Sequence, residues 1–174
     1  MIIMKRRKII LIFIAITITA AAAAVIFNRL SVLAPAYKTV MSRDGKTCIS
    51  EEGRRVTVSK GGNIIWQLPK EVLAQDFLFE DIDHDGQEEL MILCWKRGRF
   101  GKRRPFWVKY DEIGWSQHIF IYEIEGSKVK PKWMASNIGM KAASWKFEGG
   151  KLIITDTDNV TTEWVWISWG LEKL

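Results

Sequence analysis

Histidine, cysteine and proline are scarce in this 174-residue chain, which has two, two and four of them. The cysteines and histidines show neither the spacing of a zinc site nor an arrangement typical of cysteine–histidine catalysis. The sequence also lacks the Gly-x-Ser-x-Gly turn of serine hydrolases and the glycine-rich loop of phosphate-binding domains. These absences argue against the common hydrolase, zinc-dependent and nucleotide-binding classes.

Acidic residues are absent from the first 30 positions, which hold five of the 26 cations. The rest of the chain carries 21 cations against 20 acids, so the net charge of +6 arises mainly at the N-terminus. A globally basic domain would be needed for general nucleic-acid binding. The charge distribution therefore disfavours that class, and no nucleic-acid partner is expected.

A membrane anchor is predicted near the N-terminus. A basic segment, 1–8, precedes Ile9–Phe27, which contains no charge, proline or glycine. Nineteen helical residues span roughly 28 Å, close to the hydrocarbon core of a bilayer. The preceding cations place residues 1–8 in the cytoplasm and the remainder outside, in a single-pass topology. Signal peptides have shorter apolar regions of about 7–15 residues, but secretion after cleavage near Ala34–Ala36 stays open.

Residues 28–45 are expected to form a linker, and residues 46–174 an extracytoplasmic domain. In this domain, runs of β-forming residues alternate with glycine or acidic turns, as in Val56–Trp66 and His118–Ile124. Only Lys70–Ala74 resembles a helix. About nine short strands separated by turns predict a small, all-β antiparallel domain.

A weak internal repeat is visible in this domain. Val56–Trp66 and Ile119–Trp133 each contain a strand, a glycine turn and a strand that carries tryptophan. Phe147–Ile154 matches Ile82–Ile92 in the same way, with a shorter turn. If 96–115 is an insertion, the repeat approaches the length of a propeller blade, about 40–50 residues. The repeat predicts blade-like units arranged as a partial propeller or a sandwich.

The most specific motif is the acidic loop, residues 81–89, with the sequence Asp-Ile-Asp-His-Asp-Gly-Gln-Glu-Glu. Oxygen ligands at alternate positions can surround one hard cation, and Gly86 permits the sharp turn. An EF-hand would need a glutamate at loop position 12, where this chain has Ile92. The pattern predicts a structural calcium site; a solvated turn between two strands is the alternative.

The arrangement strand–DxDxDGxxE–apolar strand resembles the calcium loop of FG-GAP or VCBS-type repeats, which occur in integrin-α-like β-propellers. The resemblance covers residues 77–94 and includes one full loop, whereas members of that family usually have several. The chain has about three blades' worth of residues, fewer than the roughly four to eight of a closed propeller. The resemblance implies these calcium ligands: Asp81, Asp83, Asp85, Gln87 through its backbone, and Glu89.

A basic and aromatic segment follows the acidic loop. Its cations are Lys96, Arg97, Arg99, Lys102, Arg103 and Arg104, and Pro105–Trp107 comes next. Such a segment can bind a polyanion: lipid headgroups, an anionic envelope polymer or an acidic glycan. A solvated loop is the alternative. A disulfide between Cys48 and Cys94 also stays open.

These features together predict a membrane-anchored, extracytoplasmic, calcium-binding interaction module. Its ligand is expected to be a protein or an anionic envelope polymer or glycan. The sequence offers no catalytic constellation, so an enzyme is not favoured. The alternatives are an envelope metal-dependent hydrolase and a subunit that completes a multi-chain β assembly, and homo-oligomerisation stays open.

Overall fold

The computed structural model describes residues 37–98, 106–107, 109–110, 113–135 and 138–174. The predicted cytoplasmic segment 1–8 and the predicted anchor, Ile9–Phe27, lie outside these residues. Within the described part of the chain, no helix has the length and apolar character needed to span a membrane. The elements found there are β-strands, and the all-β prediction is confirmed.

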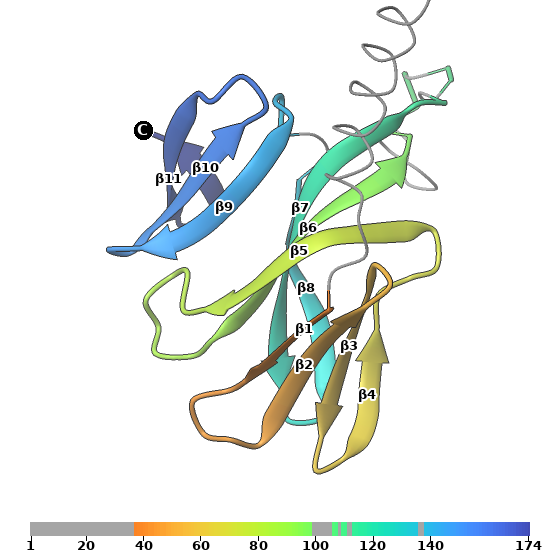
Figure 1. Cartoon of the computed structure of the whole chain (residues 1–174), viewed down its shortest axis with the longest axis vertical. Helices are drawn as coiled ribbons and strands as arrows, with labels where there is room; N and C mark the ends of the chain where they lie inside the picture. The colour runs from red at the N-terminus through yellow and green to blue at the C-terminus, as the bar shows by residue number, and fades with distance from the viewer. Residues whose placement is uncertain (1–36, 99–105, 108, 111–112, 136–137) are drawn as a thin grey trace, which may run out of the picture. The chain divides into compact units, whose positions relative to one another are not determined.

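The described strands form three four-stranded antiparallel sheets (Figure 1). The first sheet contains β1 (Tyr37–Met41), β2 (Thr47–Glu52), β3 (Arg55–Lys60) and β4 (Asn63–Gln67). The middle sheet contains β5 (Val72–Glu80), β6 (Glu89–Arg97), β7 (Trp115–Glu125) and β8 (Lys128–Met134). The third sheet contains β9 (Ala142–Glu148), β10 (Lys151–Asp156), β11 (Thr161–Ile167) and β12 (Gly170–Lys173). In each sheet every strand pairs with the next strand in sequence, so each sheet is a simple meander.

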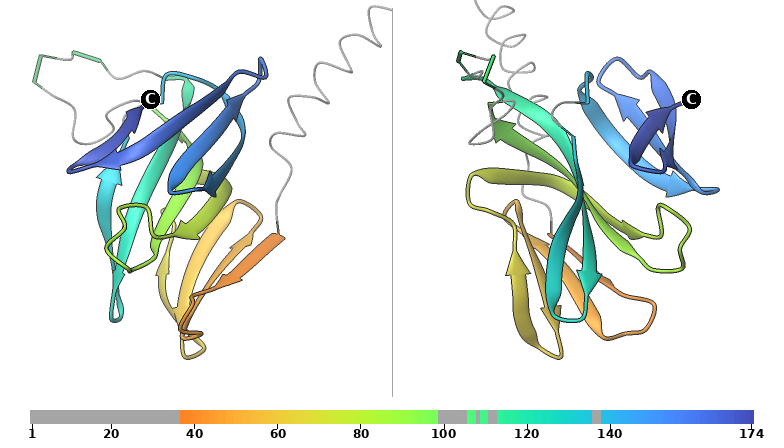
Figure 2. Two further views of the ribbon diagram at one scale, coloured as in Figure 1. Left: turned by 90° about the vertical axis from the view of Figure 1, so that its left-hand side faces the viewer. Right: turned by 180° about the vertical axis from the view of Figure 1, so that it is seen from behind.

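The middle sheet is covered on both of its faces (Figure 2). Ile92 and Cys94 of β6 belong to a first core shared with the first sheet, whereas Met91 and Leu93 belong to a second core shared with the third sheet. This division follows from the alternation of side chains along a strand. Burial on two faces also explains why β6 carries a continuous apolar run instead of an alternating pattern.

One of the two pairs of repeats lies on equivalent strands. Val56–Trp66 spans β3 and β4, and Ile119–Trp133 lies within β7 and β8, so both occupy the third and fourth strands of a sheet. Trp66 packs against Tyr122 in the first core, with ring centroids 4.7 Å apart, and Trp133 packs against the second core. The matched tryptophans therefore serve packing between sheets.

The predicted linker 28–45 is wrong over its last part, because Tyr37–Met41 forms β1 and pairs with β2. The side chains of β1 alternate between exposed and half-buried, which leaves no apolar signal in the sequence. The helix expected at Lys70–Ala74 is also wrong, since β5 begins at Val72 and buries Val72 and Ala74 in the first core. The insertion 96–115 is shorter than expected, because β6 continues to Arg97 and β7 begins at Trp115.

The two cysteines are both free thiols. Cys94 is buried in the first core, and burial raises the pKa of its thiol. Cys48 lies beside Ile49, which is in that core, and lines a shallow hollow together with Met41 and Lys60. Neighbouring side chains on a strand point to opposite faces, so Cys48 is directed away from Cys94.

Candidate metal centre

The acidic loop connects β5 to β6 and folds back on its first carboxylate. Asp81 accepts hydrogen bonds from the backbone N–H groups of Asp85 and Gly86, at 3.1 and 3.0 Å. Gly86 has a φ of 89°, in the left-handed region that glycine enters without strain. The backbone N–H of Gln87 donates to the Asp85 carboxylate at 2.8 Å. The order of aspartate and glycine in the sequence therefore gives the tight curve that was expected.

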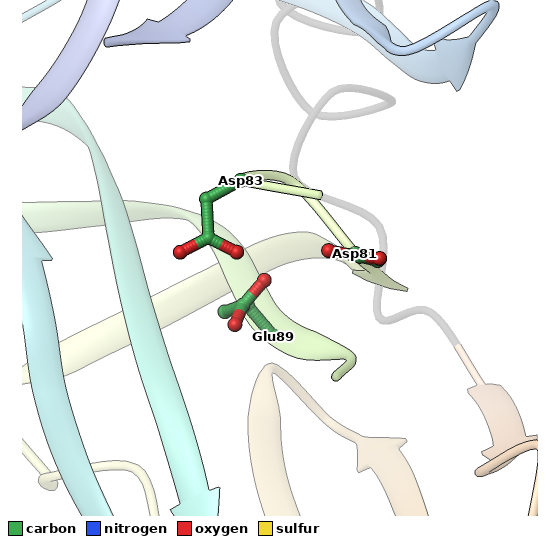
Figure 3. Close-up of side chains that lie close together, drawn as sticks. All are labelled: Asp81, Asp83 and Glu89. Atoms are coloured by element: carbon green, nitrogen blue, oxygen red, sulfur yellow. The ribbon is translucent and has the colours of Figure 1, made fainter. Parts of the chain in front are cut away.

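Three of the predicted ligands come together. Asp81, Asp83 and Glu89 each place one carboxylate oxygen within 4.8 Å of the others. Figure 3 shows the carboxylates of Asp83 and Glu89 turned toward one another, with Asp81 beside them. Asp81 and Asp83 are half-buried, whereas Glu89 is only 2% exposed. Carboxylate oxygens grouped in this way are the ligand type that calcium and magnesium prefer.

Burial is the largest influence on the pKa of Glu89. It raises the pKa of Glu89, although hydrogen bonds from Lys132 and from the Ile82 backbone act in the opposite direction. The Ile82 N–H donates to Glu89 at 3.1 Å. Asp83 Oδ1 is buried and has no hydrogen-bond partner in the described part of the chain. This carboxylate oxygen is therefore removed from water, and no hydrogen bond replaces its lost hydration.

Lys132 of β8 reaches into the carboxylate group. Its Nζ lies 2.5 Å from Asp83, 2.9 Å from Glu89 and 3.4 Å from Glu123. The same Nζ lies 5.6 Å from the centre of the Trp166 ring. Burial lowers the pKa of Lys132, but the hydrogen bonds to Asp83 and Glu89 outweigh it, and the net pKa lies above the usual value. Lys132 is therefore a protonated counter-ion for the group.

A β-bulge explains how Lys132 reaches the loop. Along β7 and β8, Tyr122 pairs with Pro131 and Ile121 pairs with Trp133, which leaves Lys132 as the extra residue. A bulge of this kind changes the direction of a side chain. Lys132 could not be predicted from the sequence, because 43 residues separate it from Glu89 and no local pattern connects the two.

The predicted ligand Asp85 is placed differently, and binding through the Gln87 backbone stays a prediction. Asp85 is exposed and lies outside the group of three, where its carboxylate accepts the hydrogen bond from the Gln87 backbone. The side chain of Gln87 is exposed. The described carboxylates that meet are thus those of loop positions 1, 3 and 9.

The acidic loop touches parts of all three sheets. Arg43, in the connection between β1 and β2, donates its backbone N–H to Glu88 at 2.8 Å and places its Nε 3.5 Å from the same carboxylate. The His84 ring lies 6.4 Å from the Phe147 ring of β9, between centroids, and a Cβ at Gly150 would lie 3.1 Å from the His84 ring. With Lys132 from the middle sheet, these contacts place the loop where the sheets meet. A cation bound here would act on the packing of the whole β domain.

The predicted polyanion-binding residues are only partly described. Lys96 and Arg97 end β6, and the Arg97 guanidinium lies 5.3 Å from the centre of the Trp115 ring. Lys96 Nζ lies 5.9 Å from the centre of the Phe120 ring. The four remaining residues, Arg99, Lys102, Arg103 and Arg104, lie outside the described residues.

A serine–histidine pair was not anticipated from the sequence. His118 Nε2 lies 2.8 Å from Ser116 Oγ, and His118 Nδ1 lies 2.9 Å from the carbonyl oxygen of Ala135. A spacing of two along β7 brings the pair to one face of the strand. His118 is fully buried, and burial lowers its pKa. The pair satisfies a buried imidazole and has no exposed face at which a substrate could meet the ring.

An aromatic hollow lies between the middle and third sheets. Its volume is about 370 Å³, and its wall includes Trp133, Trp164 and Trp169 together with Ile119 and Leu171. Trp133 and Trp164 also pack against the second core, so two of the three tryptophans serve the fold.

Comparison with family models, with curated proteins and with solved structures finds no match for this chain. The resemblance of the acidic loop to FG-GAP or VCBS-type repeats therefore stays a prediction that depends on the motif alone.

Proposed function

We propose that this protein is a membrane-anchored, extracytoplasmic interaction module whose β domain is stabilised by one calcium ion at the acidic loop. The observation that carries the proposal is the convergence of the Asp81, Asp83 and Glu89 carboxylates within 4.8 Å. These residues occupy positions 1, 3 and 9 of the loop, which the resemblance to FG-GAP or VCBS-type repeats implies as ligands. The role of the ion would be structural, because the loop contacts elements of all three sheets.

Charge balance supports a divalent ion. Among the residues that the structure describes, the three carboxylates face a single ammonium group, that of Lys132. A divalent cation would neutralise the excess negative charge and give the buried Asp83 Oδ1 a partner. Lys132 would then share Asp83 and Glu89 with the ion and oppose its entry by charge repulsion. Calcium affinity is expected to depend on how far Lys132 withdraws.

We further propose that the three sheets are blade-like units of the kind that the resemblance implies. Each sheet is a four-stranded meander, and the repeats Val56–Trp66 and Ile119–Trp133 both occupy the third and fourth strands of a sheet. Three such units are fewer than the roughly four to eight of a closed propeller. Because three units are too few to close a propeller, a second candidate function is a subunit that completes a β assembly with other chains. Light scattering that gives a monomer at high protein concentration would argue against it.

Thermal unfolding of a fragment comprising residues 35–174 tests the metal site. These residues form one compact unit that contains both cores, so the fragment is expected to fold alone. Calcium at a hundred times its Kd should add about 2.7 kcal/mol, which raises Tm by roughly 8 °C relative to chelator. Asp83→Asn should abolish the increase, and Asp158→Asn, in an exposed turn of the third sheet, should keep it.

Two outcomes would contradict the proposal. The first is a Tm that is the same in calcium and in chelator. The second is an increase that survives Asp83→Asn, which would place the ion elsewhere. Either result would reduce the acidic loop to a turn between two strands in which Lys132 pairs with Asp83 and Glu89.

A further inference from the structure

The connection between β6 and β7 exposes an unusual amount of apolar surface. Five large side chains within ten positions are exposed, by 94% at Phe106, 72% at Trp107, 78% at Tyr110, 88% at Ile113 and 45% at Trp115. We call these five residues the aromatic patch. They account for five of the twelve exposed large hydrophobic residues in the described part of the chain. Such a concentration of apolar surface marks an interaction site.

The aromatic patch does not support the fold. None of its residues belongs to either core or packs against one. Its described contacts are internal: the Phe106 and Trp107 rings meet edge to face, with centroids 4.8 Å apart. The other contacts are with cations, since Lys109 lies 5.7 Å from the centre of the Tyr110 ring. These exposed side chains therefore lower the solubility of the domain and do not stabilise its fold.

Two cations, Arg97 and Lys109, lie close to rings of the aromatic patch. Arg97 stacks near Trp115, and Lys109 lies between Trp107 and Tyr110 in the sequence. Tryptophan and tyrosine favour the boundary between lipid chains and headgroups, and lysine and arginine are attracted to anionic headgroups. A soluble polyanion would be bound by the cations alone and would leave Phe106 and Ile113 in water. A bilayer surface accommodates both kinds of side chain.

We propose that the aromatic patch inserts into the headgroup region of an anionic phospholipid bilayer, where Arg97 and Lys109 face lipid phosphates. This inference deepens the proposed function by naming the anionic partner, and it rests on the membrane location proposed above. It is independent of the metal centre. The patch would hold one side of the β domain against the membrane surface.

Photo-crosslinking with the full chain tests this contact. The chain is reconstituted in vesicles of phosphatidylcholine, with or without phosphatidylglycerol, and carries p-benzoylphenylalanine in place of Trp107. The matched control carries the same group in place of Trp169, which is 73% exposed but lies in the turn between β11 and β12. We expect lipid adducts from position 107 in vesicles that contain phosphatidylglycerol, and few from position 169.

The cations supply a second readout. Replacing both by glutamine, Arg97→Gln with Lys109→Gln, should reduce the adducts at position 107 by at least about fivefold. Raised salt should have a similar effect, because charge attraction to headgroups is screened. Equal adduct yields at positions 107 and 169, or adducts at position 107 with a second protein chain instead of lipid, would overturn the proposal.

Failure of the proposed anchor can be distinguished from failure of the proposed contact between the aromatic patch and lipid. Carbonate extraction of the same vesicles reports whether the chain is inserted. A chain that is extracted but still yields lipid adducts at position 107 would refute the anchor and support the patch. An inserted chain without adducts would refute the patch and leave the anchor intact.

Discussion

Glu51 predicts a pH dependence of stability that can be measured on its own. Its side chain is buried, with 2% exposure, and neither carboxylate oxygen has a hydrogen-bond partner in the described residues. Burial, followed by the charge of Asp76, raises its pKa to about 7, and the charges of Lys38 and Arg54 oppose this only in part. Lys38 forms an ion pair with Asp76, since its Nζ lies 2.7 Å from the Asp76 carboxylate.

The magnitude follows from the difference between folded and unfolded pKa. The ordinary value is 4.5, and each pKa unit corresponds to about 1.4 kcal/mol, so the pKa of about 7 corresponds to roughly 3 kcal/mol. Between pH 4.5 and about 7, Glu51 keeps its proton in the folded chain and releases it in the unfolded chain. The contribution of Glu51 to the free energy of unfolding is therefore highest below pH 4.5. It falls as the pH rises to 7 and is constant above it.

Urea unfolding of residues 35–174 across this pH window measures the effect. Glu51→Gln keeps the shape of the side chain but cannot ionise. The difference in unfolding free energy between Glu51→Gln and wild type should rise by roughly 3 kcal/mol from pH 4.5 to above pH 7. Glu52→Gln alters the exposed neighbouring residue and should follow the wild-type curve. A Glu51→Gln curve parallel to wild type would refute the reasoning, because other titrating groups contribute equally to both.

Two further substitutions test the packing and the metal centre. Lys132→Met should raise calcium affinity by at least about tenfold in titration calorimetry, because it removes the ammonium that opposes the ion, and an unchanged affinity would contradict that competition. Gly170→Ala should destabilise the fragment by about 1–3 kcal/mol in urea, because a Cβ there would lie 2.5 Å from the Trp133 indole nitrogen. Gly114→Ala is its control, since nothing lies within 4 Å of a Cβ at that position, and equal losses for the two alanine variants would argue against the Trp133 contact.

Local patterns were sufficient to predict much of the fold. The glycine turn at Gly61-Gly62 and the alternation around it define β3 and β4, because both depend on neighbouring residues. The helix expected at Lys70–Ala74 fails for the opposite reason. Lysine and glutamate favour a helix there, but burial of Val72 and Ala74 against the first sheet decides in favour of a strand.

The candidate site was predicted in part. The spacing of Asp81, Asp83 and Glu89 was sufficient to group them, because a short loop with a glycine at its turn brings its ends together. Lys132 could not be found in this way. Its position depends on the order of strands in the middle sheet and on a bulge opposite Ile121 and Tyr122, which are properties of strand pairing and not of local sequence.

The order of the sheets along the chain has a consequence for synthesis on the ribosome. Among the described strands none crosses from one sheet to another, so each sheet can pair its strands as soon as it emerges. Packing between sheets comes later, because Ile49 of the first sheet and Met91 and Leu93 of the middle sheet face strands that are made after them. Until β9–β12 emerge, the nascent domain presents an uncovered apolar face. The third sheet thus protects the domain from self-association during synthesis, in addition to completing its second core.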